Sequence, residues 1–411
     1  MKRSLLAGAT LSSLAVAVPC AAQSSVTLYG VIDVGINYTS NAQTGRANGA
    51  LKGASQFNMQ DGGSGGISGS RWGLRVKEDL GGGYGAIATL ENGFNIQSGT
   101  LGQGGAEFGR QAFVGLTTPY GTATAGRQYD SVVDFVQPYS TVAMWGGYPA
   151  SQPGDIDNQG NSRRVNNSVK FRSKDYGGFS FGGLYSLGGV AGSTGRNQVY
   201  SLGLGFSRGP LSIGAAYLNA RDPNYSFFGT NPSSGTAATS NNMGSFGSAT
   251  AAQSNPIFGG YSSAQTYQVI ATGASYKFGA SSVALNYNNV QFKHLEAGDG
   301  PNTLGYGGTG KFDTVEASYT LQATPSLLGG VVYEYVRSSG ANDRVAAHYN
   351  QVGVGADYLL SKRTDVYAIG VYQRASGTDS YGQSAVAAIN GQTPSASNHQ
   401  FALRLSLRHR F

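Results

Sequence analysis

The 411-residue sequence is poor in charge and contains a single cysteine. Charged residues make up 12% of the chain, about half of the roughly 25% that soluble domains carry. Aromatic residues make up 11%, which excludes a solvated disordered chain, because such chains contain few aromatics. The composition therefore indicates a folded chain that is not surrounded by water on all sides.

The single cysteine excludes an internal disulfide and a cysteine-based metal site. Cys20 lies in residues 1–22, which have the form of a secretory signal peptide: Lys2 and Arg3 precede an apolar run, and small residues follow it. Cleavage at the end of this segment would remove Lys2 and Arg3 and lower the formal net charge from +7 to +5. A lipid-modified Cys20 is the alternative, and Pro19 disfavours it, because a small residue normally precedes such a cysteine.

Long apolar runs and helical periodicity are also missing. After residue 22 the chain has no run of about 20 apolar residues, the length that a transmembrane helix needs. Two-residue alternation recurs instead, as where Trp72, Leu74 and Val76 alternate with Arg71 and Arg75. Such alternation predicts β-strands with one apolar face and one polar face.

Two kinds of connection alternate between the predicted strands. The short turns lie at 79–85, 117–122, 174–178, 207–210, 277–282, 321–326 and 360–365. The long connections, rich in Gly, Ser and Asn, lie at about 39–66, 98–105, 128–163, 188–196, 222–263, 294–308, 339–346 and 375–396. Seven short and eight long connections predict sixteen strands, an even number that closes an antiparallel sheet. Because every backbone polar group must be paired in hydrocarbon, we expect an all-β fold, a 16-stranded antiparallel transmembrane β-barrel.

The last eleven residues, FALRLSLRHRF, predict the closing strand. Their large apolar side chains would face lipid, and Arg404, Arg408 and Arg410 would face water inside, because a soluble sheet could not bury such a face. Tyrosines near strand ends predict an aromatic girdle at the membrane interfaces; ordinary strand propensity is the alternative explanation. These tyrosines are Tyr29, Tyr84, Tyr217, Tyr276, Tyr319, Tyr358 and Tyr372.

Six features in order along the chain carry a family resemblance. They are SSVTLYGVIDVGI at 24–36, SRWGLRVKEDLGGGYGAIATLENGFN at 70–95, FGRQAFVGL at 108–116, GRQYDSVVDF at 126–135, RRVNNSVKF at 163–171 and the terminal Phe411. Together they resemble the general porins of Gram-negative outer membranes. The resemblance implies a single barrel over 23–411, a homotrimer in contact with outer-membrane lipid and lipopolysaccharide, and passage of small hydrophilic solutes and anions. It also implies that Phe411 is a sorting signal for the barrel-assembly machinery.

In this family the third long loop, here about 128–163, folds into the barrel and narrows it. The resemblance implies a basic wall opposite acidic residues of that loop. The basic positions are Arg71, Arg75, Arg110, Arg127 and Arg164, with Arg163 as an alternative to Arg164; the acidic positions are Asp130 and Asp134. The loop stretch QPYSTVAMWGGYP has no acidic residue, and Asp155 and Asp157 are expected where the loop leaves the barrel. A basic wall with few acids opposite it predicts a preference for anions. Arginines at the rims in bulk solvent are the alternative.

Other functions lack their residues. The four histidines have no metal-ligand spacing, and the glycine-rich stretches at 63–70 and 81–85 do not open a helix, so we expect no metal, no cofactor and no phosphate loop. Nucleic acid is not expected as a partner, because the arginines are predicted inside a narrow tube. A barrel enzyme would need converging catalytic groups, and His348 with Asp343 is the nearest approach. A passive diffusion channel is therefore predicted, and a channel specific for phosphate or organic anions and an adhesin or receptor barrel stay open as alternatives.

Overall fold

The computed structural model describes residues 24–47, 49–223, 255–297, 302, 304–342 and 346–411. The predicted signal segment, 1–22, lies outside the described residues. The strands are β1 (Ser25–Ala47), β2 (Ala50–Asp61), β3 (Arg71–Gly81), β4 (Tyr84–Asn95), β5 (Thr100–Leu101), β6 (Gln111–Thr117), β7 (Gly121–Gln128), β8 (Val165–Ser173), β9 (Phe179–Ser186), β10 (Val199–Arg208), β11 (Leu211–Arg221), β12 (Thr266–Phe278), β13 (Ser281–Lys293), β14 (Thr309–Thr324), β15 (Leu327–Gly340), β16 (His348–Leu359), β17 (Thr364–Ser376) and β18 (His399–Arg410).

The helices of the described residues are short. They are α1 (Gly62–Gly65), α2 (Ser131–Phe135), α3 (Thr141–Met144), and the 3₁₀ turns η1 (Gln103–Gly105), η2 (Gln137–Tyr139), η3 (Tyr148–Ala150), η4 (Pro153–Asp155) and η5 (Gly259–Tyr261). Across the part of the chain that the structure describes, no helix has the length and apolar character needed to cross a membrane.

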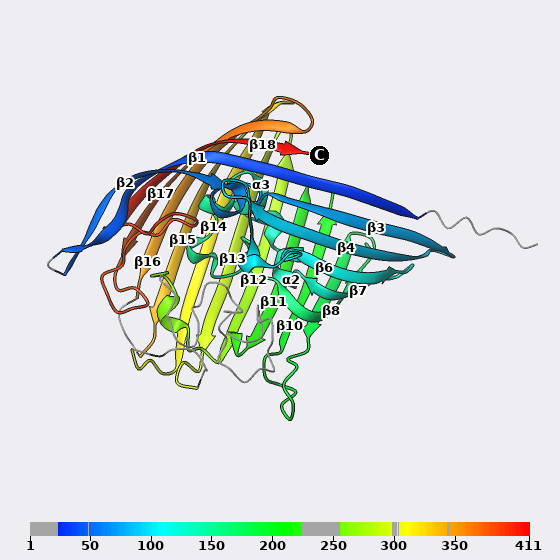
Figure 1. Cartoon of the computed structure of the whole chain (residues 1–411), viewed down its shortest axis with the longest axis horizontal. Helices are drawn as coiled ribbons and strands as arrows, with labels where there is room; N and C mark the ends of the chain where they lie inside the picture. The colour runs from blue at the N-terminus through cyan, green and yellow to red at the C-terminus, as the bar shows by residue number, and fades with distance from the viewer. Residues whose placement is uncertain (1–23, 48, 224–254, 298–301, 303, 343–345) are drawn as a thin grey trace, which may run out of the picture.

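The strands form one closed antiparallel barrel (Figure 1). β1 pairs with β18, which joins the two ends of the sheet. β2 and β3 both pair with β1, at different heights, and so form one wall strand that residues 62–70 interrupt. β5 pairs only with β4. The eighteen segments in the described residues therefore occupy sixteen positions around the barrel, which confirms the predicted fold class.

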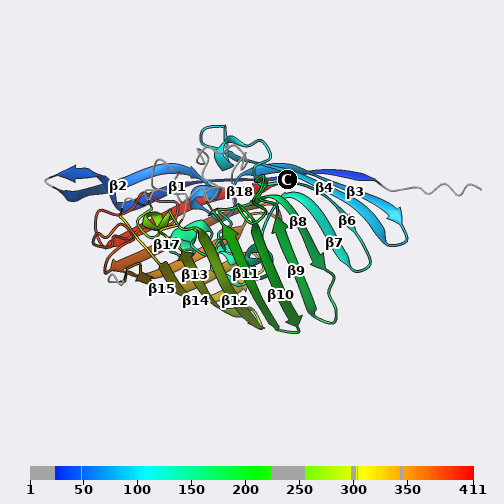
Figure 2. The same cartoon turned by 90° about the horizontal axis from the view of Figure 1, so that it is seen from below.

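The seven short turns fall where the alternation predicts them, but one long connection differs. Residues 39–66 were expected to form a loop, whereas β1 continues to Ala47 and pairs with β2 as far as Ala50. This hairpin extends beyond the neighbouring strands (Figures 1 and 2). Ladder hydrogen bonds between the two strands satisfy backbone groups that a loop would leave to water.

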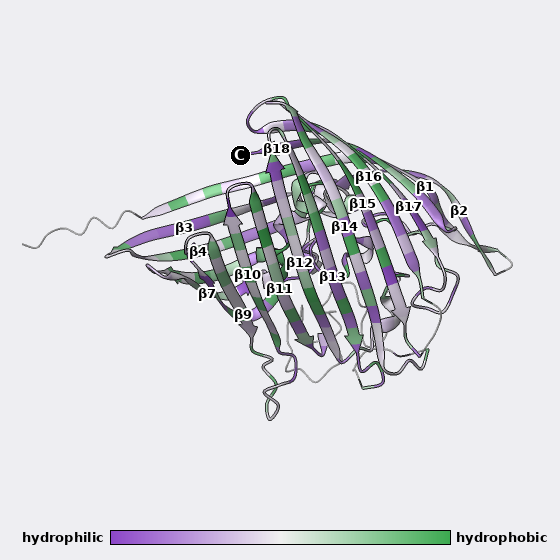
Figure 3. Ribbon diagram, turned by 180° about the vertical axis from the view of Figure 1, so that it is seen from behind, coloured by the Kyte–Doolittle hydropathy of each residue, from purple (hydrophilic) through white to green (hydrophobic). Residues whose placement is uncertain are grey.

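The outer face of the barrel is apolar, as the alternation predicts. Leu403, Leu405 and Leu407 of β18 are exposed, and alternation of hydropathy runs along the strands in Figure 3. Most tyrosines of the predicted girdle, such as Tyr276, are also exposed on this face. The prediction for Tyr29 is wrong, because its hydroxyl donates to Glu91 on the inner face at 2.9 Å.

The inner face is apolar on one side of the barrel, which differs from the polar inner face that the alternation predicts. Near the long-loop ends of β12–β16, the side chains of Tyr267, Phe292 and Phe312 are fully buried. They belong to a hydrophobic core with residues of two connections, 255–265 and 377–398, among them Phe258. These connections therefore cover that part of the wall from within.

Candidate pore constriction

The connection 129–164 between β7 and β8 packs on the inner wall, and its first anchor is α2. Asp130 caps this helix by accepting from the amides of Val132 and Val133 at 2.7 and 3.3 Å. Phe135 at its end lies against Gly203 of β10, where a Cβ would come within 2.2 Å of the ring. Only glycine allows this approach, because a side chain at position 203 would collide with the ring. Gly203 therefore determines where the start of the loop packs on the wall.

Further along, the loop is held by β14–β17. Glu316 of β14 accepts from the amide and hydroxyl of Thr141 at 2.7 and 2.9 Å. Trp145 is 2% exposed and lies against Gly330 and Gly355, where a Cβ would come within 2.1 and 2.6 Å of the indole. Asn390, in the connection 377–398, donates to the carbonyl of residue 152 at 2.7 Å. The loop is therefore bound to one side of the interior.

The interruption between β2 and β3 supplies a second inward segment, residues 62–70. Its amides donate to side chains of three strands: Ser68 to Asp33 at 3.0 Å, Gly63 to Asp61 at 2.7 Å and Ile67 to Tyr367 at 3.1 Å. The amide of Tyr148 donates to the carbonyl of residue 66 at 2.9 Å, which joins this segment to the loop 129–164. The glycines of this segment are recognisable from the sequence as loop residues, but no sequence pattern predicts that they enter the barrel.

Arg404 of β18 lies against segment 62–70 on the side of the barrel wall. The sequence predicted that this side chain faces water, but it is 2% exposed and pairs with Asp33 at 3.2 Å. The hydroxyl of Tyr367 also contacts Asp33, at 2.7 Å. Arg404 therefore points inward, as the alternation requires, but segment 62–70 shields it from the passage.

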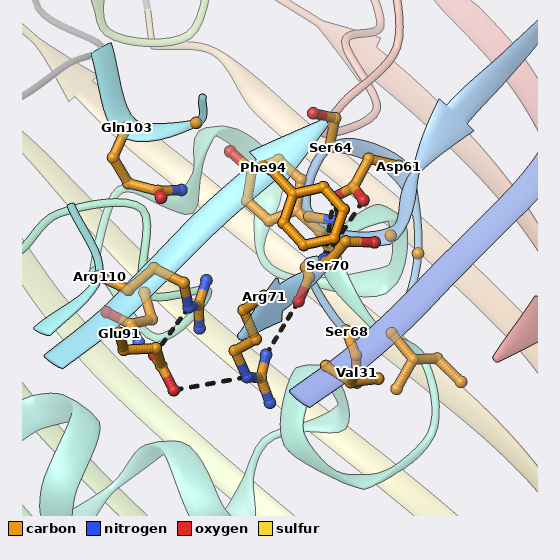
Figure 4. Close-up of a pocket in the computed structure, with 18 of the residues that line it drawn as sticks. Val31, Asp61, Ser64, Ser68, Ser70, Arg71, Glu91, Phe94, Gln103 and Arg110 are labelled. Carbon is orange, nitrogen blue, oxygen red and sulfur yellow. Dashed lines mark hydrogen bonds and ion pairs between the residues drawn. The ribbon is translucent and has the colours of Figure 1, made fainter. Parts of the chain in front are cut away.

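A cavity of about 1190 Å³ remains between the loop, segment 62–70 and the wall formed by β1, β3 and β4 (Figure 4). Its charged lining residues are Arg71, Arg75, Arg110, Arg164, Arg408 and Arg410, with Asp61, Glu91 and Asp357. Four of the five basic positions implied by the resemblance thus line one cavity. Arg408 and Arg410 were predicted to face inward from the closing strand, but not to belong to this site.

Glu91 of β4 is the centre of the basic cluster (Figure 4). Its carboxylate accepts from Arg110 at 2.8 Å and lies 3.6 Å from Arg71. It also accepts from the hydroxyls of Tyr29 and Tyr129, at 2.9 and 3.3 Å. Glu91 is not among the predicted site residues, although strand phase places it on the inner face, because the adjacent Leu90 faces outward.

Arg164 is buried in this cluster and makes few hydrogen bonds to the protein. It is 6% exposed, its Nη1 donates to Ser162 at 3.3 Å, and its Nε has no hydrogen-bond partner in the structure. Burial and the nearby charge of Arg110 lower its pKa to about 10, so it stays charged at neutral pH. Arg163 instead donates to the carbonyl of residue 155 at 2.7 Å and lies outside the cavity lining.

Three predicted site residues lie outside this lining. Arg127 donates to the carbonyl of residue 109 at 2.8 Å. Asp130 is fully buried as the cap of α2, and burial raises its pKa to about 6. Asp134 pairs with Lys170 at 2.7 Å. The loop therefore contributes no carboxylate to the cavity lining; it contributes Tyr129, Gln137, Val142, Ala143, Met144, Tyr148, Gly160, Asn161, Ser162 and Arg164.

Asp155 and Asp157 are buried within the loop rather than placed at an exit. Asp157 accepts from the amide of Gln159 at 3.1 Å and from Asn288 of β13 at 2.9 Å. Burial, followed by the carboxylate of Asp155, raises its pKa to about 7. Within the described residues, no group of histidine, cysteine, aspartate and glutamate is arranged to hold a metal ion.

Comparison with known proteins agrees with this architecture. The family model described as Gram-negative porin matches residues 8–378. The chain is 31% identical to an outer membrane porin protein of Bordetella pertussis, over 91% of this chain and 94% of that one. It is 26% identical to outer membrane porin protein 32 of Delftia acidovorans over the full length of both.

Solved structures share the fold. An anion-selective porin from Comamonas acidovorans superimposes with a TM-score of 0.67 at 21% identity, covering 95% of this chain and all of the other. OmpT of Vibrio cholerae gives 0.60 at 15% identity, covering 94% and 98%. With a barrel that closes on itself, an apolar outer face and a charged internal cavity, the chain belongs to the Gram-negative porin family and is an outer-membrane porin, a passive channel rather than an enzyme.

Proposed function

We propose that the barrel is a diffusion channel for small hydrophilic solutes that prefers anions. The observation that carries this proposal is the charge of the cavity lining, in which six arginines face three carboxylates. When all are ionised, three positive charges remain uncompensated. Rings of basic side chains are a known means of favouring anions in pores.

The expected preference is modest. Two unit charges about 4 Å apart interact by roughly 4 kcal/mol at an effective dielectric of 20, but pore water and salt screen this strongly. A remaining difference of about 1 kcal/mol between anion and cation corresponds to about fivefold selectivity. A solved porin with the same fold is described as anion-selective, which agrees with the direction of the proposed preference.

The direct test is the reversal potential of the purified protein in a planar bilayer under a gradient of potassium chloride. We expect the sign that corresponds to chloride preference, at about fivefold. A cation-selective reversal potential would refute the proposal. Repeating the measurement at high salt is the control, because screening should reduce the preference.

A channel specific for organic anions is a second candidate, and the apolar face of the lining favours it. Val142, Ala143 and Met144 of the loop and Ile67 of the glycine segment line the cavity together with the arginines. A carboxylate with an apolar body could contact both surfaces. Solute block of the chloride current by an aromatic carboxylate, compared with phosphate and a neutral sugar, separates the candidates: selective block indicates a specific site, and unobstructed current indicates a general channel.

The proposed assembly is a homotrimer, and strand length supports it. Strands β6–β9 have 7 to 9 residues, whereas β12–β17 have 12 to 16. A tilted strand needs about 9 to 11 residues to cross the membrane, so a neighbouring subunit would cover the low side of the wall. Native mass spectrometry should give three chains per particle; a monomer in mild detergent would contradict this.

Export and insertion complete the proposal. Residues 1–22 act as a cleaved signal peptide, and N-terminal sequencing of the mature protein should begin at Gln23. Phe411 acts as the sorting signal for the assembly machinery; the residue is 44% exposed and its backbone pairs with Gly30. Deletion of Phe411 should reduce the folded protein in outer-membrane fractions, and normal insertion of the shortened chain would count against this role.

A further inference from the structure

Asn390, in the connection between β17 and β18, binds one turn of the loop 129–164. The residue is 6% exposed. Its carboxamide oxygen accepts from the amide of Gly154 at 2.7 Å. Its nitrogen donates to the hydroxyl of Ser151 and to the carbonyl of residue 152, each at 2.7 Å. One side chain from the far end of the sequence therefore holds both ends of this turn.

The turn 151–154 joins two parts of the loop that line the cavity. Before it, Tyr148 lines the cavity, and the carbonyl of this residue accepts from the hydroxyl that opens the turn at 2.6 Å. After it, the carboxylate of Asp155 accepts from the amides of Gly160 and Ser162 at 2.6 and 3.1 Å. Both of these residues line the cavity. The position of the turn therefore affects the lining on both of its sides.

The turn has few contacts of its own that could fix its place. It lies between two 3₁₀ turns of three residues each, η3 and η4, and such short turns have poor hydrogen-bond geometry. Gly154 has a φ of +77°, which residues with a Cβ rarely adopt. The buried side-chain amide of Gln152 has no hydrogen-bond partner among the described residues. The turn therefore depends on the side chain of Asn390.

The next residue, Gly391, packs on the other segment that borders the cavity. A Cβ at this position would come within 1.6 Å of the carbonyl oxygen of Ser64, in the glycine segment 62–70. The carbonyl of residue 391 also accepts from Gln60 at 3.1 Å. Gly391 and Ser64 both line the cavity. Two adjacent residues of one connection thus contact both segments that narrow the passage.

The residues just before this pair are fixed to the barrel wall. The amide of Ala388 donates to Gln373 of β17 at 2.6 Å, and the amide of Ile389 donates to Gln400 of β18 at 3.0 Å. The side chain of Ile389 is 1% exposed and belongs to the same hydrophobic cluster as Trp145. The amide side chain that binds the turn therefore extends from an anchored backbone.

The same connection continues beside the surface hairpin of β1 and β2. Ala42 and Ser395 form an antiparallel bridge, with backbone hydrogen bonds of 2.9 Å on both sides of it. The hydroxyl of Thr39 also donates to Gln392 at 2.7 Å. The hairpin extends beyond the neighbouring strands (Figure 1). Gln392 follows Asn390 by two residues, so a displacement of the hairpin reaches the segments that border the pore over a short length of chain.

We propose that Asn390 is a positioning residue of the pore, and that the surface hairpin acts on the outline of the passage through it. Residues 392–396 bind the hairpin, and residues 390 and 391 bind the two segments that border the cavity. A displacement of the hairpin therefore changes the width of the passage while the strands of the wall stay paired. The inference rests on solutes passing through this cavity, as in the proposed function, but it does not depend on the sign of the ion preference.

A purely structural role, in which the connection only covers the barrel, is the competing explanation. The cover is formed by residues such as Ala385 and Ala388, which belong to the hydrophobic core with Phe292. The side chain of Asn390 instead directs its hydrogen bonds to the loop 129–164. The ladder between β17 and β18 does not include it. Loss of this side chain should therefore alter the loop and leave the barrel folded.

Bilayer recording of Asn390→Ala tests the positioning role. Asn398→Ala is the matched control, because Asn398 is exposed in the same connection. Release of the turn should raise the single-channel conductance and the open-channel noise of Asn390→Ala, each by about twofold, because pore width governs conduction. The control should match the parent protein, and the heat-dependent gel migration of a folded barrel should be the same for both variants. A folded Asn390→Ala protein with the parent's conductance and noise would overturn the proposal.

Two further variants keep this result interpretable. Asn390→Asp keeps the volume of the side chain and the acceptor for Gly154 but loses the donors, so it should change the conductance in the same direction and replaces the alanine variant if that chain does not insert. Arg164→Gln reports separately whether ions pass through the cavity. If its reversal potential shifts while the Asn390 variants conduct like the parent, the positioning role fails and the proposed function stands.

A reversible cross-link tests the part played by the hairpin. Ala42→Cys with Ser395→Cys places two cysteines at the antiparallel bridge, where a Cα separation of about 4.5–5.5 Å suits a disulfide. The single cysteine of the chain, Cys20, lies in the predicted signal segment and does not interfere. Ala42→Cys with Ala54→Cys is the control, because it links the same residue to its partner within the hairpin.

Oxidation of the first pair should lower the open-channel noise by about twofold, because the hairpin is then tied to the connection that positions the pore, and a reductant should restore it. The control pair should show no change of noise on oxidation or reduction. An equal response of the two pairs would show that the hairpin does not act through this connection and would refute that part of the inference.

Discussion

The two sides of the barrel interior are built on the same strand pattern but differ in what covers them. Along β12–β17, the inward side chains are buried under the connections 129–164, 255–265 and 377–398. Next to β1, β3 and β4, inward arginines of β3, of β18 and of the adjoining connections line an open cavity. The strands thus determine the outer wall, whereas the inward-folded segments determine where a passage remains.

This difference also decides how polar side chains behave. On the filled side, Glu316 and Asn288 hydrogen-bond to the loop and so hold it on the wall. On the open side, Arg164 lines the cavity and carries its positive charge there. Substitutions on the filled side should therefore change the shape of the pore, and substitutions on the open side should change its selectivity.

The largest expected effect is that of Trp145→Ala on the filled side. Removing this buried indole from its contacts with Gly330 and Gly355 should cost about 3–5 kcal/mol of the free energy of unfolding, the usual range for a buried tryptophan. Release of the loop should also raise the single-channel conductance. Urea unfolding and bilayer recording measure the two effects.

Trp72→Ala is the control for this substitution, because Trp72 is the other tryptophan of the chain and is 36% exposed on the outer face. It should leave the conductance unchanged. If both variants conducted alike, the loop would not depend on the contacts of Trp145, and the distinction between a filled side and an open side would lose its basis.

The next effect is a change of selectivity by charge removal on the open side. Glu91→Gln frees Arg71 and Arg110 from their carboxylate partner, so the anion preference should rise about threefold, which corresponds to about 0.6 kcal/mol. Arg164→Gln should lower it by a similar factor. Reversal potentials of the two variants should shift in opposite directions, and shifts of the same sign would disagree with the described cavity.

The pH dependence of loop packing should be smaller and should originate on the filled side. Burial raises the pKa of Asp157 to about 7, from about 3.9 in an unfolded chain. The folded protein therefore keeps this proton to higher pH, and its stability falls as pH rises from about 4 to 7. Burial raises the pKa of Asp130 to about 6, which acts in the same direction.

Measurements at pH 5 and pH 8 test this expectation. The free energy of unfolding should be higher at pH 5, and current fluctuations should be more frequent at pH 8. Asp157→Asn should reduce the difference between the two pH values. An identical difference in the variant would exclude Asp157 as a contributor.

The smallest effects are expected for two residues that the resemblance implied but that lie outside the cavity lining. Arg127→Gln and Asp134→Asn should each change the reversal potential by less than the shift of Arg164→Gln, because Arg127 donates to a backbone carbonyl and Asp134 pairs with Lys170. An Arg127→Gln shift as large as that of Arg164→Gln would mean that ions follow another path through the barrel.

Local sequence patterns were sufficient for the wall of the barrel. Period-two alternation and the seven tight turns predicted sixteen strands, and the same phase directed Arg71 and Arg75 inward. The same reasoning places Glu91 on the inner face, because it follows Leu90, whose side chain faces outward. Its importance depends on Arg110 of a neighbouring segment and Tyr29 of the first strand, which no local pattern connects to it.

The contents of the barrel could not be predicted in this way. Segment 62–70 is positioned by Asp33 and Tyr367, which lie far apart in the sequence and meet only when the barrel closes. The apolar inner residues, such as Phe292 and Phe312, showed only that some cover was needed, and not which connection would supply it. Long-range contacts of this kind leave no periodic signal.

The interrupted wall strand has a consequence for biogenesis. The glycine segment that borders the pore hydrogen-bonds to Asp33 of the first strand and to Tyr367 of β17, and Arg404 of β18 lies against its Gly66. A nascent barrel in which β1 and β18 are not yet paired lacks two of these three supports, Tyr367 and Arg404. The opening through which solutes pass can therefore acquire its final outline only at the moment the seam is sealed, so an incompletely inserted molecule would have no finished aperture.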